Sequence, residues 1–199
     1  MLPADQQRIQ AFDEDDAEMG KRQLRQQQDL CREYLQALEQ AVDLRQLATV
    51  QQLCEALGTQ RQRPIYLEAR PLPPPLTGVC IGSKATDYVF YAEDAPLPLQ
   101  EHIILHEVAH VLLGLPETLR SLIARWEVST PPPALPPALL DAALKRTCYD
   151  NESECLAEML ATLIEQRWRT LRQRESDLAS HLWGTPDLRW LSEQAGDVG

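Results

Sequence analysis

The N-terminal part of the chain alternates apolar and polar residues with the period of an α-helix. Over residues 21–42 the apolar side chains fall on one face, which predicts an amphipathic helix. Residues 44–57 repeat this pattern and are followed by Gly58, a residue type that often ends a helix. The acidic residues 1–20 predict a loose helix or a frayed tail. We expect the helix over residues 21–42 to pack on the folded domain, and the alternative is a partner-binding or coiled-coil arm.

The middle of the chain changes to short runs that are typical of β-strands. Residues 63–69, 77–81 and 87–91 are rich in β-branched and aromatic side chains, and prolines or a glycine turn separate them. A strongly apolar segment over residues 101–113 then predicts a buried helix. The fold class we expect is α+β. A small, mainly antiparallel sheet packs against the helix that carries His106 and against a second ligand-bearing helix, with extra N-terminal helices.

The C-terminal part again has helical periodicity. Helices are expected over residues 118–127, 138–146 and 152 to about 172, and the prolines of residues 129–137 predict a rigid loop. The expected organisation is an N-terminal helical region (1–58), a core that carries the chemistry (59–175) and a C-terminal tail (176–199).

Composition narrows the class of protein. Nineteen basic against thirty acidic residues give a net charge of −11, which argues against direct binding of nucleic acid. The first residues lack the pattern of a signal peptide, and no run of about 18 apolar residues is present to span a membrane. Five cysteines without a CxxC pair fit a reducing compartment. We therefore expect a cytoplasmic protein that does not contact a membrane.

The apolar helix contains the motif His106-Glu107-Val108-Ala109-His110. Residues four apart lie on one face of a helix, so both imidazoles can reach a single ion. Glu107 lies about 100° around the helix from His106, beside the ion rather than on it. Two His ligands, an open position and a Glu general base are the parts of a zinc hydrolase. The alternative is a pair of buried histidines with ordinary hydrogen bonds.

A third ligand is expected from the helix that begins near Asn151. In the thermolysin-like arrangement a Glu on a second helix binds the metal, and a polar residue four positions later bonds the first His. Glu154 and Glu158 have this spacing, and Glu152 and Cys155 are the alternatives for the ligand.

These residues resemble the ImmA/IrrE family of metallopeptidases. The likeness covers about residues 60–168 and is carried by residues 103–113, by the strand-like residues 87–91 and by Glu154-x-x-Ala157-Glu158. Ala109 stands where family members usually have Gly, and Leu156 where they often have a second Glu. The resemblance implies a zinc peptidase that acts on a protein or peptide, such as a DNA-binding helix-turn-helix repressor.

The mechanism expected from these residues is metal-assisted peptide hydrolysis. Zn²⁺ held by His106, His110 and Glu154 activates a water whose proton Glu107 removes. Tyr149 and His102 are candidates for stabilising the oxyanion. The alternative function is a zinc-containing regulatory module, or a member of a toxin–antitoxin pair, that works by binding and has no peptidase activity.

Overall fold

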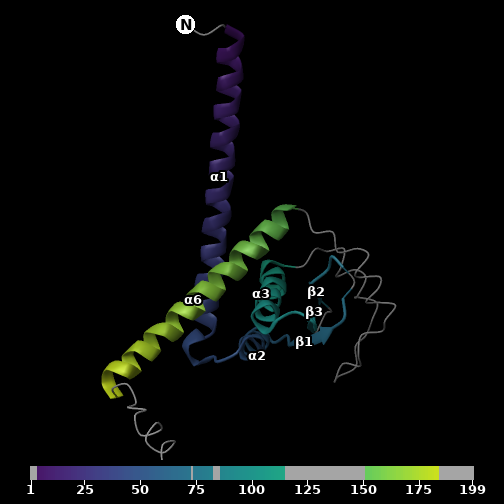
Figure 1. The fold of residues 1–199 in the computed structure, drawn as a ribbon, viewed down its shortest axis with the longest axis vertical. Helices are drawn as coiled ribbons and strands as arrows, with labels where there is room; N and C mark the ends of the chain where they lie inside the picture. Colours follow the sequence, from purple (N-terminus) through teal and green to yellow (C-terminus); the bar gives the residue numbers. More distant parts are fainter. Residues whose placement is uncertain (1–3, 73, 83–85, 115–150, 184–199) are drawn as a thin grey trace, which may run out of the picture.

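The computed structural model describes residues 4–72, 74–82, 86–114 and 151–183, and these form a mixed α+β fold (Figure 1). A three-stranded sheet, the helix α3 (Leu97–Leu113) and the helix α6 (Asn151–Trp183) form successive layers. The expected fold class is thus confirmed. The remaining elements are α1 (Ala4–Ala41), the 3₁₀ turn η1 (Leu44–Gln46), α2 (Val50–Gln60), β1 (Ile65–Arg70), β2 (Gly78–Gly82) and β3 (Asp87–Ala92).

The sheet has the order β1-β3-β2 and contains both strand directions. β2 pairs with β3 in antiparallel register, with Gly78 opposite Tyr91, as expected. β1 pairs with β3 in parallel register, with Ile65 opposite Asp87, so the expectation of an antiparallel sheet is wrong for β1. The polarity of each strand's side chains does not encode the direction of its neighbour, and the chain crosses from β1 through the edge strand β2 before it enters the centre.

Asp87 fixes the parallel pair at the first residue of β3. Its carboxylate is 1% exposed and accepts a hydrogen bond from Arg61 Nη1 at 2.8 Å, with Arg63 on its other oxygen. The Asp87 backbone N–H donates to the carbonyl of Pro64 at 2.9 Å. A buried carboxylate needs such partners because an unpaired buried charge costs several kcal/mol. Three contacts therefore hold the end of α2 and the start of β1 against β3.

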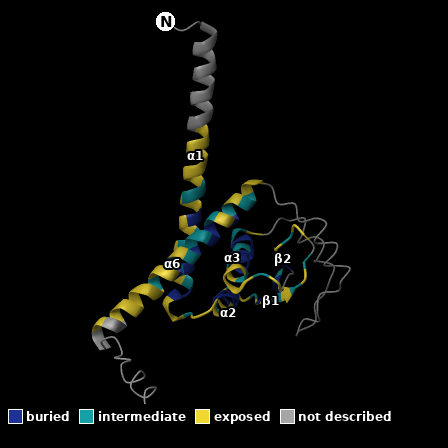
Figure 2. Ribbon diagram, in the orientation of Figure 1, coloured by how far each residue is buried: buried dark blue, intermediate teal, exposed yellow. Residues whose placement is uncertain are grey.

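Small buried residues bring α3 and α6 close together. Ala109 on α3 and Ala157 and Ala161 on α6 have no exposed surface. Leu105 and Leu160 fill the space beside them. Figure 2 shows the buried residues gathered where α1, α2, α3 and α6 meet. Side chains that project from this contact can reach across from one helix to the other.

The N-terminal helices differ from the expectation in their bounds. Residues 4–41 form one continuous helix, and its end packs on α6 through Cys31 and Leu38, which confirms a packed helix there. Leu24, by contrast, is 46% exposed, on the stretch of α1 that extends away from the core (Figure 2). The long helix expected over residues 44–57 is divided in two, because the side chain of Thr49 caps α2.

Gly58 lies inside α2 rather than ending it, since the helix continues to Gln60. A Cβ at Gly58 would lie 3.0 Å from the Cα of Pro64. This glycine therefore permits close packing of the chain that enters β1, and the expectation that it ends the helix is wrong.

Some expectations fall on parts of the chain beyond the described ranges. These are the helices over 118–127 and 138–146, the proline loop and Tyr149. α6 continues well past residue 172, to Trp183. Within the described ranges no helix is both long and apolar enough to cross a membrane.

Candidate metal centre

Helix α3 places its polar residues on two different sides. It begins after Pro96 and has Pro98 in its first turn. Backbone N–H groups of a first turn have no partner within the helix, so a proline there costs no hydrogen bond. The helix ends at Gly114, whose φ is 93°. His102, His106 and His110 recur every four residues and form the side that faces α6. The two helices run antiparallel, since His110 meets Glu154 whereas His102 meets Glu158 and Glu165 farther along α6.

His106, His110 and Glu154 form a cluster that could hold a metal ion. The Nε2 atoms of the two histidines are 3.1 Å apart. Glu154 Oε2 lies 3.2 Å from His106 Nε2, and Glu154 Oε1 lies 3.4 Å from His110 Nε2. Tetrahedral zinc, with bonds of about 2.0–2.2 Å, separates its ligand atoms by about 3.4 Å. The three side chains are thus already spaced as zinc ligands are.

The pKa of His110 is suited to a metal ligand. Its side chain is 4% exposed. Burial, and then the neighbouring His106, lower the pKa of His110 to about 4. At neutral pH the imidazole is therefore uncharged, which is the form that binds metal.

Glu158 contacts the other side of the His106 ring. Its Oε2 lies 3.1 Å from His106 Nδ1. If Nδ1 carries the proton and donates to this carboxylate, the lone pair of Nε2 is directed toward Glu154 and His110. This contact is the one that the thermolysin-like spacing predicts.

Glu107 lies on a different side of α3, against the strand β2. It is 5% exposed and accepts hydrogen bonds from the thiol and the backbone of Cys80. Burial, and then the charge of Glu154, raise the pKa of Glu107 to about 8. Its Oε2 is buried and has no hydrogen-bond partner among the described residues. The carboxyl is therefore near the cluster, and one of its oxygens is available to a small polar molecule.

Gly78 of β2 makes room for this carboxyl. A Cβ at this position would lie 2.7 Å from Glu107 Oε1 and 2.6 Å from the side chain of Ile103. The functions of Gly78 and Cys80 were not anticipated from the sequence. A glycine within a strand often marks the close approach of another group, and that signal was present.

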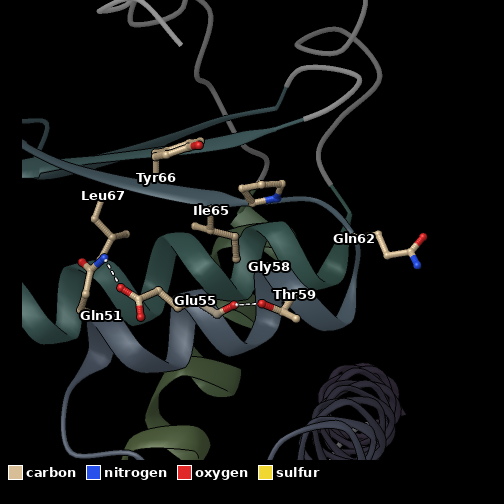
Figure 3. A pocket seen from close by; sticks show the side chains of 9 residues that line it. Gln51, Glu55, Gly58, Thr59, Gln62, Ile65, Tyr66 and Leu67 are labelled. Carbon is tan, nitrogen blue, oxygen red and sulfur yellow. Dashed lines mark hydrogen bonds between the residues drawn. The ribbon is translucent and has the colours of Figure 1, made fainter. Parts of the chain in front are cut away.

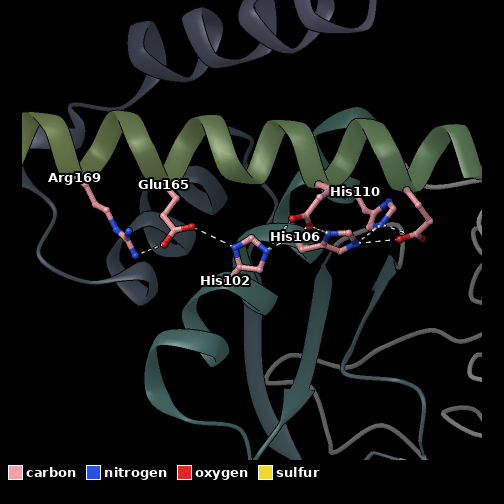
Figure 4. A network of polar contacts seen from close by, with 7 residues as sticks. His102, His106, His110, Glu165 and Arg169 are labelled. Atoms are coloured by element: carbon pink, nitrogen blue, oxygen red, sulfur yellow. Dashed lines mark hydrogen bonds and ion pairs between the residues drawn. The ribbon is translucent and has the colours of Figure 1, made fainter. Parts of the chain in front are cut away.

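The other predicted residues lie outside the cluster. His102 has its two ring nitrogens 3.3 Å from Glu158 and 3.2 Å from Glu165 (Figure 4). Glu152 contacts Gln23 and Gln27 of α1, and Cys155 is exposed. Of the three candidates for a third ligand, the structure brings only Glu154 to the histidines.

The donor set fits zinc. Two imidazoles and one carboxylate are a ligand set found in catalytic zinc sites that keep a fourth position open. A second observation that points to a bound polar group is Glu107 Oε2, which has no hydrogen-bond partner among the described residues. A buried carboxyl oxygen is costly unless it bonds something such as water.

A separate cavity of about 550 Å³ lies between α2 and β1 (Figure 3). It is lined by Gln51, Glu55 and Thr59 of α2 and by Ile65 and Leu67 of β1. Glu55 and Tyr66 are the ionisable residues of its lining, and the lining includes none of the cluster residues. The lining of this cavity therefore gives no reason to place the chemistry between α2 and β1.

Comparisons of the chain with family models, with curated proteins and with solved structures find no match, so its function has to be inferred from the geometry of the metal centre itself.

Proposed function

We propose that the chain is a zinc-dependent metallopeptidase with His106, His110 and Glu154 as metal ligands. The observation that carries the proposal is the spacing of 3.1–3.4 Å among their ligand atoms. Zinc is favoured over Mg²⁺ or Ca²⁺ because two of the three donors are imidazole nitrogens, whereas those ions prefer oxygen. A bound Zn²⁺ supplies a Lewis acid for a carbonyl and lowers the pKa of a water molecule toward ~7.

Glu107 is the general base in this proposal. It removes a proton from the attacking water and transfers it to the leaving amine, so it must be a carboxylate at the start of the reaction. In the metal-free protein its pKa of about 8 keeps it mostly protonated at neutral pH. Positive charge at the cluster favours the carboxylate form, because an opposite charge nearby lowers the pKa of an acid. Loading of the cluster therefore prepares Glu107 for its role.

Other residues of the site hold the metal ligands and the base in position. Glu158 holds Nδ1 of His106, and Cys80 holds one oxygen of Glu107. β2 is an edge strand of the described sheet and touches Glu107, so an extended peptide that adds to this edge would pass close to the base. The resemblance to ImmA/IrrE peptidases suggests that a helix-turn-helix repressor is the natural partner.

One observation favours a second candidate, a zinc-containing regulatory module that works by binding alone. Glu107 is almost fully enclosed and is already bonded by Cys80, as a purely structural side chain would be. In that case the fold presents a partner-binding surface and the metal only stabilises it.

The substitution Glu107→Gln separates the two candidates. Gln matches the shape of Glu but cannot accept the proton, so zinc and fold should be kept while turnover falls by about 10²–10⁴-fold. Cleavage is measured on a peptide library and on a candidate repressor. Glu101→Gln, an exposed change on the same helix, is the matched control and should cleave normally.

Full cleavage by Glu107→Gln would remove Glu107 from the mechanism. Loss of zinc on this substitution would instead make Glu107 a ligand. If the wild-type protein binds zinc and a repressor but cleaves nothing, the binding module is the better account.

A further inference from the structure

The three histidines of α3 and three glutamates of α6 form one continuous set of contacts between the antiparallel helices. We name this set the His–Glu ladder; its members are His102, His106, His110, Glu154, Glu158 and Glu165 (Figure 4). His102 and the middle histidine, His106, each lie between two carboxylates. The metal cluster is one end of the ladder, and the other end has no part in the chemistry described so far.

Glu158 is the member whose position is least secured by burial. Its side chain is 55% exposed, and a glutamate has three rotatable bonds, so solvent competes with any single contact that it makes. It lies 3.1 Å from His106 Nδ1 on one side and 3.3 Å from His102 Nε2 on the other. Two histidines one helical turn apart therefore hold the same carboxylate.

His102 is itself held in place from the opposite side. Its Nδ1 lies 3.2 Å from Glu165 Oε2, and Glu165 pairs with Arg169 one turn farther along α6. Glu165 and His102 are 26% and 30% exposed, whereas Arg169 is 75% exposed. Solvent screens exposed ion pairs strongly, so Glu165 contributes most to the fixing of His102 and Arg169 contributes little.

We propose that His102 is a positioning residue of the metal centre, which holds Glu158 against His106 and thereby keeps His106 Nε2 directed at the ion. This inference rests on the proposed zinc centre and extends it by one turn of each helix. It gives His102 a function different from stabilising an oxyanion, since both of its ring nitrogens already face carboxylates.

Two isosteric substitutions distinguish the two nitrogens of His102. The amide nitrogen of Gln takes the place of Nε2, so His102→Gln keeps the contact with Glu158 and loses the one with Glu165. The amide nitrogen of Asn takes the place of Nδ1, so His102→Asn keeps Glu165 and loses Glu158. Both replacements are polar and His102 is 30% exposed, so neither should unfold the protein.

The test measures Zn²⁺ affinity of the full chain by competition with a chromophoric chelator, together with the visible absorption of the Co²⁺-loaded protein. His102→Asn should bind Zn²⁺ about 10-fold more weakly, the lower end of the range for groups that orient a metal ligand, and should alter the Co²⁺ bands. His102→Gln should remain near wild type. In a Glu158→Ala background, His102→Asn should have no further effect, because the contact that it removes is already gone.

Equal affinity in wild type, His102→Asn and His102→Gln would overturn the proposal and leave the zinc centre intact. Equal weakening in both variants, or weakening in the Glu158→Ala background, would show that ring packing rather than the contact with Glu158 matters, and would also overturn it. Failure of the wild-type protein to bind Zn²⁺ or Co²⁺ would overturn the zinc centre and this inference with it.

Discussion

Glutamate side chains lie on two sides of helix α3, and they differ in how far they are exposed to solvent. On the sheet side, Glu107 is 5% exposed and is enclosed by Gly78 and Cys80 of β2. On the α6 side, Glu154 and Glu158 are 43% and 55% exposed. The first carboxyl is hydrogen-bonded by the thiol and the backbone of Cys80, and the other two contact the histidines of α3.

This difference indicates how each side responds to its surroundings. Removal of water raises the pKa of Glu107 and makes the protonation of that residue part of the energy of the fold. The carboxylates on α6 remain in contact with water, so their positions depend on partners and on a bound ion. The sheet side should therefore be sensitive to pH and to added volume, and the α6 side should be sensitive to metal.

The largest expected effect on the sheet side is a dependence of stability on pH. The pKa of Glu107 rises from 4.5 when unfolded to about 8 when folded, so the folded state holds this proton more tightly. Its contribution to stability is complete below pH 4.5 and is lost as the pH rises through about 8. Each pKa unit is worth about 1.4 kcal/mol, so the loss amounts to several kcal/mol.

Urea unfolding of the metal-free protein at about pH 5 and about pH 8 measures this loss. Glu107→Gln cannot titrate, so its free energy of unfolding should exceed that of wild type increasingly as the pH rises. His110 titrates in both proteins, so its contribution cancels in the comparison. A constant difference between the two proteins over this range would contradict the account of Glu107.

A smaller effect is expected from filling the space beside the same carboxyl. Gly78→Ala places a methyl group 2.6–2.7 Å from Ile103 and Glu107, so one of them must move. Overpacking of this kind costs about 1–3 kcal/mol. Gly20→Ala in α1 is the matched control, because a Cβ there meets no atom within 4 Å, and it should stabilise the exposed helix by up to about 1 kcal/mol.

Thermal or urea unfolding of the two glycine variants tests this contrast. If Gly78→Ala unfolds like wild type, the wall beside Glu107 is looser than the structure indicates.

The sequence predicted the parts of the site that depend on spacing along one helix. His106 and His110 share a face because they are four residues apart, and the structure brings them together with Glu154. Glu154 was predicted from the thermolysin-like pattern and not from periodicity alone. In the structure, Glu152 contacts α1 and Cys155 is exposed, so neither takes the place of Glu154 beside the histidines. Spacing within a helix is local information, and a single sequence carries it well.

The parts that depend on distant segments were missed for a physical reason. Contacts between Gly78 and Glu107, or between His102 and Glu165, join residues whose relative positions are set by packing. The parallel pairing of β1 with β3 is of the same kind, since it depends on how the chain crosses the sheet. A strand's own alternation of side chains fixes which face is buried but not which strand lies beside it.

The most direct test of the metal centre is the zinc content of the purified protein after equilibration with Zn²⁺ and removal of unbound ion. Wild type should retain about one zinc per chain, as should Glu152→Ala, because Glu152 faces α1 instead of the histidines. Zinc should be lost from His106→Ala, and Glu154→Ala should retain much less than wild type. A folded wild-type protein that holds no zinc, or a Glu154→Ala variant that holds as much as Glu152→Ala, would contradict the ligand set proposed for this centre.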